Sequence, residues 1–145
     1  ASTLLALLAS LAPAAADAAV GAPHVIMVTQ ATADISDYAL WSHRVNKAYA
    51  AKHGYTFLSA NSSEAYVGFE RDVRWSKVKI LSDLMERKGE AGELTVVHST
   101  PPAPDASGRV YMWIDADAVV LNFEKRVEGL LEGNEKKSMV VSLGG

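Results

Sequence analysis

Apolar runs separated by polar turns predict an alternation of strands and helices along this chain. His24–Thr29 is an apolar run of the kind that forms a buried strand, and the polar segment Gln30–Ser36 after it reads as a loop. Asp37 can cap a helix that continues to Gly54, where glycine commonly ends helices. Tyr55–Leu58 predicts a second strand. The apolar residues that recur at helical spacing in between are Tyr38, Trp41, Val45, Ala48 and Tyr49.

The rest of the chain continues this alternation. The further predicted elements are, in order, a surface loop at Ser59–Arg71, a helix at Val73–Lys88 ended by Gly89, a short apolar run at Leu94–Val97, a proline-rich loop at Pro101–Gly108, a strand at Tyr111–Ile114, a second apolar group at Ala118–Leu121, a helix at Phe123–Leu131 and a last strand at Ser138–Leu143. Strand–helix–strand order is typical of parallel sheets, so we expect an α/β fold with a mainly parallel sheet.

Composition excludes several classes of protein. The chain has 145 residues, of which 49% are hydrophobic and 21% are charged, as in an ordinary globular domain. A net charge of -3 without a long basic cluster argues against nucleic acid as a partner. The absence of cysteine excludes disulfides, thiolate metal sites and cysteine nucleophiles.

The N-terminal segment Thr3–Ala16 is rich in leucine and alanine and has the length of a signal-peptide core, shorter than the ~20 residues that span a bilayer. Neither an initiator methionine nor a basic region precedes it, so we expect the chain to be truncated at its start. Residues 1–22 are therefore interpreted as a signal peptide or truncated membrane anchor with its linker, and 23–145 as the folded part; an alanine-rich helix is the alternative. The glycosylation acceptor at Asn61 agrees with a lumenal location.

Two carboxylates follow the strand predicted at Tyr111–Ile114. Asp115 and Asp117 are two positions apart, and in an extended segment such residues point the same way, so both can hold one divalent cation. Burying two unpaired charges between apolar flanks would be costly, so a metal, a basic partner or solvent must compensate them. The alternative is a solvated turn. In open α/β sheets ligands collect beyond the carboxyl ends of strands, where Thr29 and Gln30 are also expected.

Three segments resemble the galactosyl/mannosyltransferase family of Golgi glycosyltransferases, which includes fungal α-galactosyl- and α-mannosyltransferases and plant xyloglucan xylosyltransferases. Asn46–Tyr55 is similar to a family helix with an Asn, a Tyr and a His-Gly-Tyr exit, and Arg71–Val78 to an Arg-Asp-x-x-Trp-x-Lys helix start. Trp113–Ala118 is similar to the Trp-x-Asp-x-Asp-Ala strand. The resemblance runs from about His24 to Asn122 and covers the front half of a family catalytic domain.

The resemblance implies an enzyme with the nucleotide-diphospho-sugar transferase fold called GT-A, which moves a hexose or pentose to a glycan or glycoprotein acceptor. It implies that Asp115 and Asp117 bind Mn²⁺, or Mg²⁺, against the donor diphosphate, and that Lys77 is a candidate nucleotide contact. Thr29 and Gln30 would border the base by position alone. For Trp75, packing in the core is the favoured role.

The resemblance further implies a Golgi lumenal location, a type II membrane anchor and a transferase complex. The segment Gly92–Gly108 is longer than the family connector and is interpreted as an inserted hairpin or loop. We expect the fold to be incomplete at the C-terminus, with the acceptor site and the catalytic residues beyond residue 145. This chain alone would then bind the donor without transferring the sugar.

Two alternatives stay open. In a haloacid dehalogenase-type phosphatase Asp115 would be the nucleophile and Asp117 the general acid, with Mg²⁺ between them, although that motif normally opens its domain. In a non-catalytic lumenal module the fold would serve binding or assembly. His24, His43 and His98 lack a spaced partner, so we do not expect them to bind a metal.

Overall fold

The computed structural model of this chain describes residues 21–61, 75–86, 94–102, 105–134 and 136–137. Within them a four-stranded sheet has the order β3-β2-β1-β4. The strands are β1 His24–Ala31, β2 Thr56–Asn61, β3 Leu94–His98 and β4 Arg109–Trp113. β1 pairs in parallel with β2 and β4, whereas β3 pairs antiparallel with β2. The prediction of an α/β fold with a mainly parallel sheet is confirmed, and this open sheet is compatible with a Rossmann-like domain.

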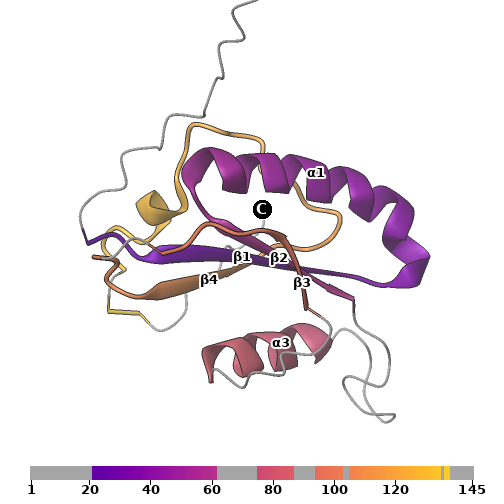
Figure 1. Cartoon of the computed structure of the whole chain (residues 1–145), viewed down its shortest axis with the longest axis horizontal. Helices are drawn as coiled ribbons and strands as arrows, with labels where there is room; N and C mark the ends of the chain where they lie inside the picture. Colours follow the sequence, from indigo (N-terminus) through magenta and orange to yellow (C-terminus); the bar gives the residue numbers. More distant parts are fainter. Residues whose placement is uncertain (1–20, 62–74, 87–93, 103–104, 135, 138–145) are drawn as a thin grey trace, which may run out of the picture.

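Two helices cover opposite faces of the sheet (Figure 1). Helix α1, Ser36–His53, follows the short 3-10 turn η1, Ala33–Ile35, and ends where Gly54 takes the left-handed conformation with φ of 72°. Helix α3, Ser76–Met85, lies on the other face. Each of the two faces of the sheet therefore has its own apolar layer.

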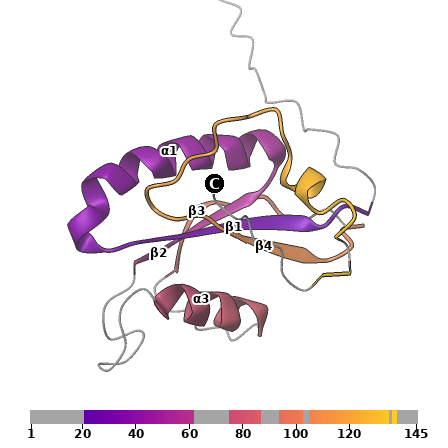
Figure 2. The same cartoon turned by 180° about the vertical axis from the view of Figure 1, so that it is seen from behind.

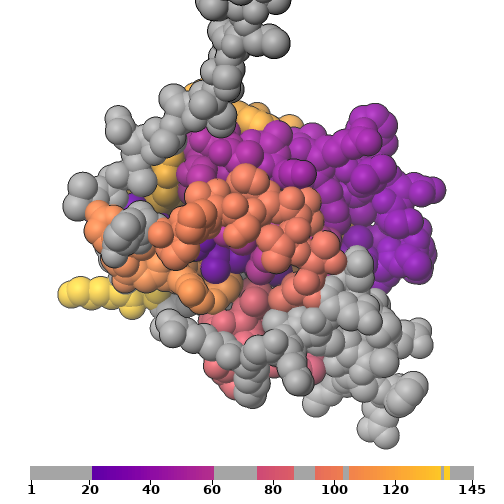
Figure 3. Space-filling view, viewed as in Figure 1, coloured from indigo at the N-terminus to yellow at the C-terminus, as the bar shows by residue number. Residues whose placement is uncertain are grey.

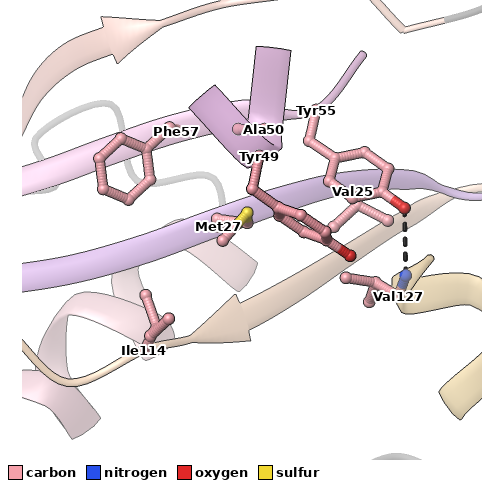
Figure 4. Close-up of a cluster of buried hydrophobic side chains, with 8 residues drawn as sticks. All are labelled: Val25, Met27, Tyr49, Ala50, Tyr55, Phe57, Ile114 and Val127. Carbon is pink, nitrogen blue, oxygen red and sulfur yellow. Dashed lines mark hydrogen bonds between the residues drawn. The ribbon is translucent and has the colours of Figure 1, made fainter. Parts of the chain in front are cut away.

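Alternation along β1 divides the core between these layers, because successive strand residues point to opposite faces. Val25 and Met27 lie in the cluster beneath α1, while Ile26 and Val28 lie in the cluster beneath α3. Figure 4 shows the cluster under α1, in which Tyr55 from the end of the α1–β2 connection also packs. The buried members of this cluster are Val25, Met27, Tyr49, Ala50, Tyr55, Phe57, Ile114 and Val127.

The chain after β4 differs from the prediction. The second apolar group, Ala118–Leu121, has no regular secondary structure, and the helix expected at Phe123–Leu131 is only a 3-10 turn, η3, Val127–Leu130. This segment instead runs irregularly beside α1 (Figure 2). Before η3, side chains bind backbone groups of this segment: the Tyr49 hydroxyl donates to the Lys125 carbonyl at 2.6 Å, and the Val127 amide donates to the Tyr55 hydroxyl at 3.1 Å. These side-chain partners compete with a regular helix for the same backbone groups.

A polar cluster fixes the end of this segment against α1. Glu128 accepts hydrogen bonds from the Tyr55 hydroxyl and from Arg126, the latter at 2.7 Å. His53 Nε2 donates to the Phe123 carbonyl at 2.8 Å, and Arg126 donates to His53 Nδ1 at 3.3 Å. Burial, and next the hydrogen bond to Glu128, raise the pKa of Tyr55. The cluster is therefore a structural clamp that keeps the Tyr55 hydroxyl protonated.

The predicted start of α1 is wrong, and of its predicted apolar positions Tyr49 is buried whereas Tyr38, Trp41 and Ala48 are exposed. The helix begins at Ser36, the capping position is Ile35 without a side-chain hydrogen bond, and Asp37 lies in the first turn, where its charge still favours the helix dipole. Trp41 is 66% exposed. Apart from Tyr49, the buried residues of α1 are small or polar: Ala39, Ser42, Asn46, Ala50 and His53.

Of the second predicted helix, Val73–Lys88, the structure describes the part that forms α3, Ser76–Met85. On α3, Ile80 is buried while Val78 and Met85 are exposed. Trp75 is 55% exposed, so the expectation that it packs in the core is wrong. The segment Gly92–Gly108 contributes β3 in its described part. No helix in the described part of the chain is both long and apolar enough to cross a membrane.

Some predictions fall on residues outside the described ranges. They are the N-terminal run Thr3–Ala16, the predicted loop from Ser62 onward, the start of the second helix at Val73 with Arg71 and Asp72, its end at Lys88 and Gly89, and the last strand Ser138–Leu143. The first residues of that predicted loop, Ser59–Asn61, instead form the end of β2, so the glycosylation acceptor Asn61 is the last residue of this strand.

Candidate functional site

The two acidic residues lie in a turn at the carboxyl end of β4. The Ile114 amide donates to the Val28 carbonyl at 2.9 Å, which extends the pairing of β4 with β1 by one residue. The Ala118 amide then donates to the Asp115 carbonyl at 3.0 Å and closes a β-turn. The expectation of an extended segment is therefore wrong here, because the chain turns at the end of the sheet to run beside α1. We call residues Asp115–Ala118 the acidic turn.

Buried side chains of α1 hold the backbone of the acidic turn. The Ser42 hydroxyl shares its one proton between the Ala116 carbonyl and the Ala39 carbonyl of its own helix, the latter at 2.9 Å. Asn46 Nδ2 donates to the Ala118 carbonyl at 2.9 Å. The Val120 amide donates to Asn46 Oδ1 at 3.0 Å, so the Asn46 side-chain amide both donates and accepts a hydrogen bond. Ser42 is 4% exposed and Asn46 1% exposed. Such buried, satisfied polar groups restrict the turn to one arrangement.

Sequence reasoning placed Asn46 in a motif but missed the role that it shares with Ser42. The available signal was their spacing: positions 39, 42, 46, 50 and 53 follow the helical period and carry small or polar side chains. A helix side of this kind predicts close approach to another backbone, although the sequence does not say to which one.

The carboxylates point away from this anchored backbone. Ala116 between them is 7% exposed, while Asp115 and Asp117 are exposed. Trp113 Nε1 donates to Asp115 Oδ1 at 2.7 Å, which orients this carboxylate. Neither carboxylate forms a salt bridge with a basic side chain of the described residues. Most of their oxygen lone pairs therefore stay available to a cation or to water.

This donor set fits a divalent cation in part. Carboxylate oxygens are the ligands that Mg²⁺ and Mn²⁺ prefer. Within the described ranges, however, no group of three or more His, Asp or Glu side chains is arranged to hold a metal. Asp115 and Asp117 would thus supply only part of a coordination shell, and the remaining ligands would have to come from a bound phosphate and from water.

The other predicted site residues lie around the same sheet. Thr29 and Gln30 lie near the end of β1, which is Ala31, and Thr29 follows Val28, the register partner of Trp113. The Thr29 side chain is fully buried under α1 rather than on the surface, and Gln30 is half-buried. Lys77 is exposed on α3, on the sheet face opposite α1. The structure brings Asp115 and Asp117 together in the acidic turn, and ligand contacts by the other three residues stay predictions.

Two buried polar atoms, Thr29 Oγ1 and His43 Nε2, have no hydrogen-bond partner among the described residues. The His43 ring packs edge-on against Phe57, with 5.7 Å between ring centroids. Burial lowers the pKa of His43 below its ordinary value, because the charged imidazolium would lose hydration there. His43 is therefore a neutral residue of the α1–sheet interface.

Comparison with known proteins gives no match to a protein family, to a curated protein or to a solved structure.

Proposed function

We propose that this chain is the donor-binding part of a metal-dependent glycosyltransferase with a GT-A-type fold. The observation that carries the proposal is the acidic turn: two exposed carboxylates at the carboxyl end of β4, beside the end of β1, on a backbone that buried side chains fix. Ligands of open α/β sheets collect at this edge, where the strand order reverses. The motif resemblance at Trp113–Ala118 suggests the glycosyltransferase family. The geometry of the acidic turn is compatible with metal-dependent binding of a donor diphosphate.

Loss of the nucleoside diphosphate from the sugar develops negative charge on the departing phosphate oxygens. A divalent cation such as Mn²⁺, held by Asp115 and Asp117, would supply Lewis-acid stabilisation of that charge. The protein contributes orientation: Trp113 fixes the Asp115 carboxylate at 2.7 Å, and Ser42 and Asn46 fix the turn below it. A pre-formed turn pays less ordering entropy when the donor binds. Lys77 would add a positive charge beside the nucleotide.

The wider assignment follows from the resemblance. The acceptor is a glycan or glycoprotein, the location is the Golgi lumen with a type II anchor, and the transferase works in a complex with other subunits.

Calorimetric titration of UDP and of GDP, each with and without Mn²⁺, tests the donor site. We expect metal-dependent binding by the wild-type chain and its loss in Asp115→Asn/Asp117→Asn. The matched control is Asp105→Asn/Glu132→Gln, which makes the same change of net charge at exposed positions outside the acidic turn. Equal binding by both double variants, or no metal dependence in the wild type, would contradict the proposal.

The phosphatase alternative makes a different prediction for the same variants. It requires Mg²⁺-dependent hydrolysis of p-nitrophenyl phosphate that Asp115→Asn abolishes, because Asp115 would be the nucleophile. A non-catalytic lumenal module requires neither hydrolysis nor metal-dependent nucleotide binding. The titration and the hydrolysis assay together separate the three functions.

A further inference from the structure

An open hollow of about 430 Å³ lies on the α3 face of the sheet, at the amino-terminal ends of β1, β2 and β4. Figure 3 shows it between the orange segment around residue 100 and the α3 helix, with indigo atoms of β1 at its bottom. His24 lines the hollow, whereas Thr29, near the other end of β1, lies about 16 Å away at ~3.3 Å per residue. The hollow is therefore separate from the acidic turn and independent of the proposed function.

The floor of the hollow is apolar. Ile26, Leu58 and Tyr111 come from three neighbouring strands and share the α3 face of the sheet. The Tyr111 hydroxyl donates to the Leu84 carbonyl at 3.0 Å, so its polar end is satisfied. Pro101 and Pro102 border the opening. An aromatic or aliphatic body can bury apolar surface against this floor, as in most small-molecule sites.

One wall carries an ordered chain of hydrogen bonds. The Thr56 hydroxyl donates to the Thr100 carbonyl at 3.2 Å, and because it has one proton, it accepts its other bond from His24 Nε2 at 3.0 Å. This arrangement fixes the His24 tautomer with its proton on Nε2. Burial, and next the charge of Arg109, lower the pKa of His24, which agrees with a neutral ring. The wall is thus pre-organised before any ligand binds.

Two charged residues line the hollow, Asp83 and Arg109. Asp83 is 6% exposed and ion-paired, with its carboxylate 2.7 Å from Lys79 Nζ. Arg109 is the register partner of His24 and lies at the rim, exposed, and it forms no ion pair within the part of the chain that the structure describes. Because His24 is neutral, the uncompensated positive charge is that of Arg109.

We propose that this hollow binds a small organic anion, a carboxylate or a phosphate ester, whose charged group pairs with Arg109 and whose apolar body lies on Ile26, Leu58 and Tyr111. The guanidinium group recognises both anions through paired N–H donors. The volume lies within the range of known small-molecule sites, about 300 to 1,000 Å³.

The test is a titration followed by amide NMR and calorimetry with three probes that share an aromatic body: phenyl phosphate, benzoate and neutral benzyl alcohol. We expect one or both anions to shift the amides of His24, Thr56 and Arg109 and to leave those of the acidic turn unmoved. Binding by phenyl phosphate alone would identify a phosphate ester as the ligand class, and binding by benzoate alone a carboxylate. Equal binding of benzyl alcohol would overturn the role of the charge.

Variants separate this site from unspecific attraction. Arg109→Gln should weaken anion binding by about tenfold or more, because it removes a charge-assisted pair. Arg44→Gln, an equal change of charge at an exposed position of α1, should leave binding unchanged. Ser99→Trp should block the hollow from its exposed rim without touching the buried core. The proposal would be overturned if Arg109→Gln or Ser99→Trp bound the anions with unchanged affinity. It would also be overturned if none of the probes shifted these amides at millimolar concentration and tenfold molar excess over the protein.

Discussion

Replacing Asn46 with alanine tests whether α1 holds the acidic turn. The substitution removes two hydrogen bonds, from Asn46 Nδ2 to the Ala118 carbonyl at 2.9 Å and from the Val120 amide to Asn46 Oδ1 at 3.0 Å. Alanine favours the helix, so the helix itself is not weakened by the change. The expected loss of stability therefore reports the contact between α1 and the segment after β4.

The magnitude follows from what the substitution leaves behind. Two backbone groups lose their partners, and an unsatisfied buried group costs about 1 to 3 kcal/mol. Ala118 and Val120 are half-buried, so water can reach them in part, and the low end of this range applies to each. Together they give roughly 2 to 3 kcal/mol, a large part of the 5 to 15 kcal/mol that typically stabilises a domain.

Equilibrium unfolding in urea measures this loss, with an expected fall in the midpoint of about 1 to 2 M. Lys47→Ala is the matched control, because Lys47 is the next residue of α1 and is exposed, and we expect it to stay within ~0.5 kcal/mol of the wild type. Asn46→Asp keeps the acceptor for the Val120 amide but places a carboxylate oxygen against the Ala118 carbonyl. It should cost at least as much as Asn46→Ala at pH 7.

The reasoning would be refuted if Asn46→Ala were no less stable than Lys47→Ala. It would also be refuted if Asn46→Asp restored wild-type stability, because the donated hydrogen bond to Ala118 would then have no value. Under the proposed function, Asn46→Ala also weakens Mn²⁺-dependent nucleotide binding at temperatures where the variant stays folded, since the acidic turn loses its anchor.

Two further predictions concern the C-terminal end of α1 and the interior of the α1 layer. Gly54→Ala should destabilise the protein by about 1 kcal/mol in thermal melts, because Gly54 has a φ of 72°. The added methyl group meets no atom closer than 3.9 Å, so only backbone strain contributes. Gly129→Ala, at an open position without positive φ, should be neutral in the same assay, and equal losses of stability in the two variants would contradict the strain argument. Burial holds the pKa of His43 below its ordinary 6.5, so the unfolded chain takes up that proton first and stability falls as the pH drops below 6.5. His43→Leu should reduce the loss of stability between pH 7.5 and pH 5 and leave the share that comes from His24, whose pKa is also lowered. Identical profiles of stability against pH for wild type and variant would exclude His43 as a cause of the loss.

The apolar runs alone were enough to predict three of the four strands and the class of the fold. β1 and β2 are short runs that are buried by packing on both faces, and such strands are apolar regardless of which neighbour they pair with. β4 is half-buried after Arg109, but its apolar run Val110–Trp113 was readable in the same way. Gly54 was equally readable as the end of α1, because left-handed backbone is costly for other residues. The antiparallel direction of β3 was not readable, since the same five residues can pair either way.

The acidic pair was found for a similar local reason: two carboxylates directly after an apolar strand must lie at its exposed end. The conformation of the pair could not be predicted, because the turn at Asp115–Ala118 depends on the packing of the following segment beside α1. The hollow near Arg109 was also invisible in the sequence, since its lining comes from segments as far apart as β1 and β4.

Helix α1 shows most clearly what the sequence determined and what only the tertiary structure decided. The sequence determined that a helix lies between β1 and Gly54, because local propensity and the glycine stop act within a few residues. It could not assign the buried side, on which Ser42 and Asn46 replace the expected Trp41. A buried amide is stable only where its hydrogen bonds are satisfied, and for Asn46 the partners lie 72 and 74 residues further along the chain. Hydrophobic periodicity contains no information about those partners, so the fold had to bring them together first.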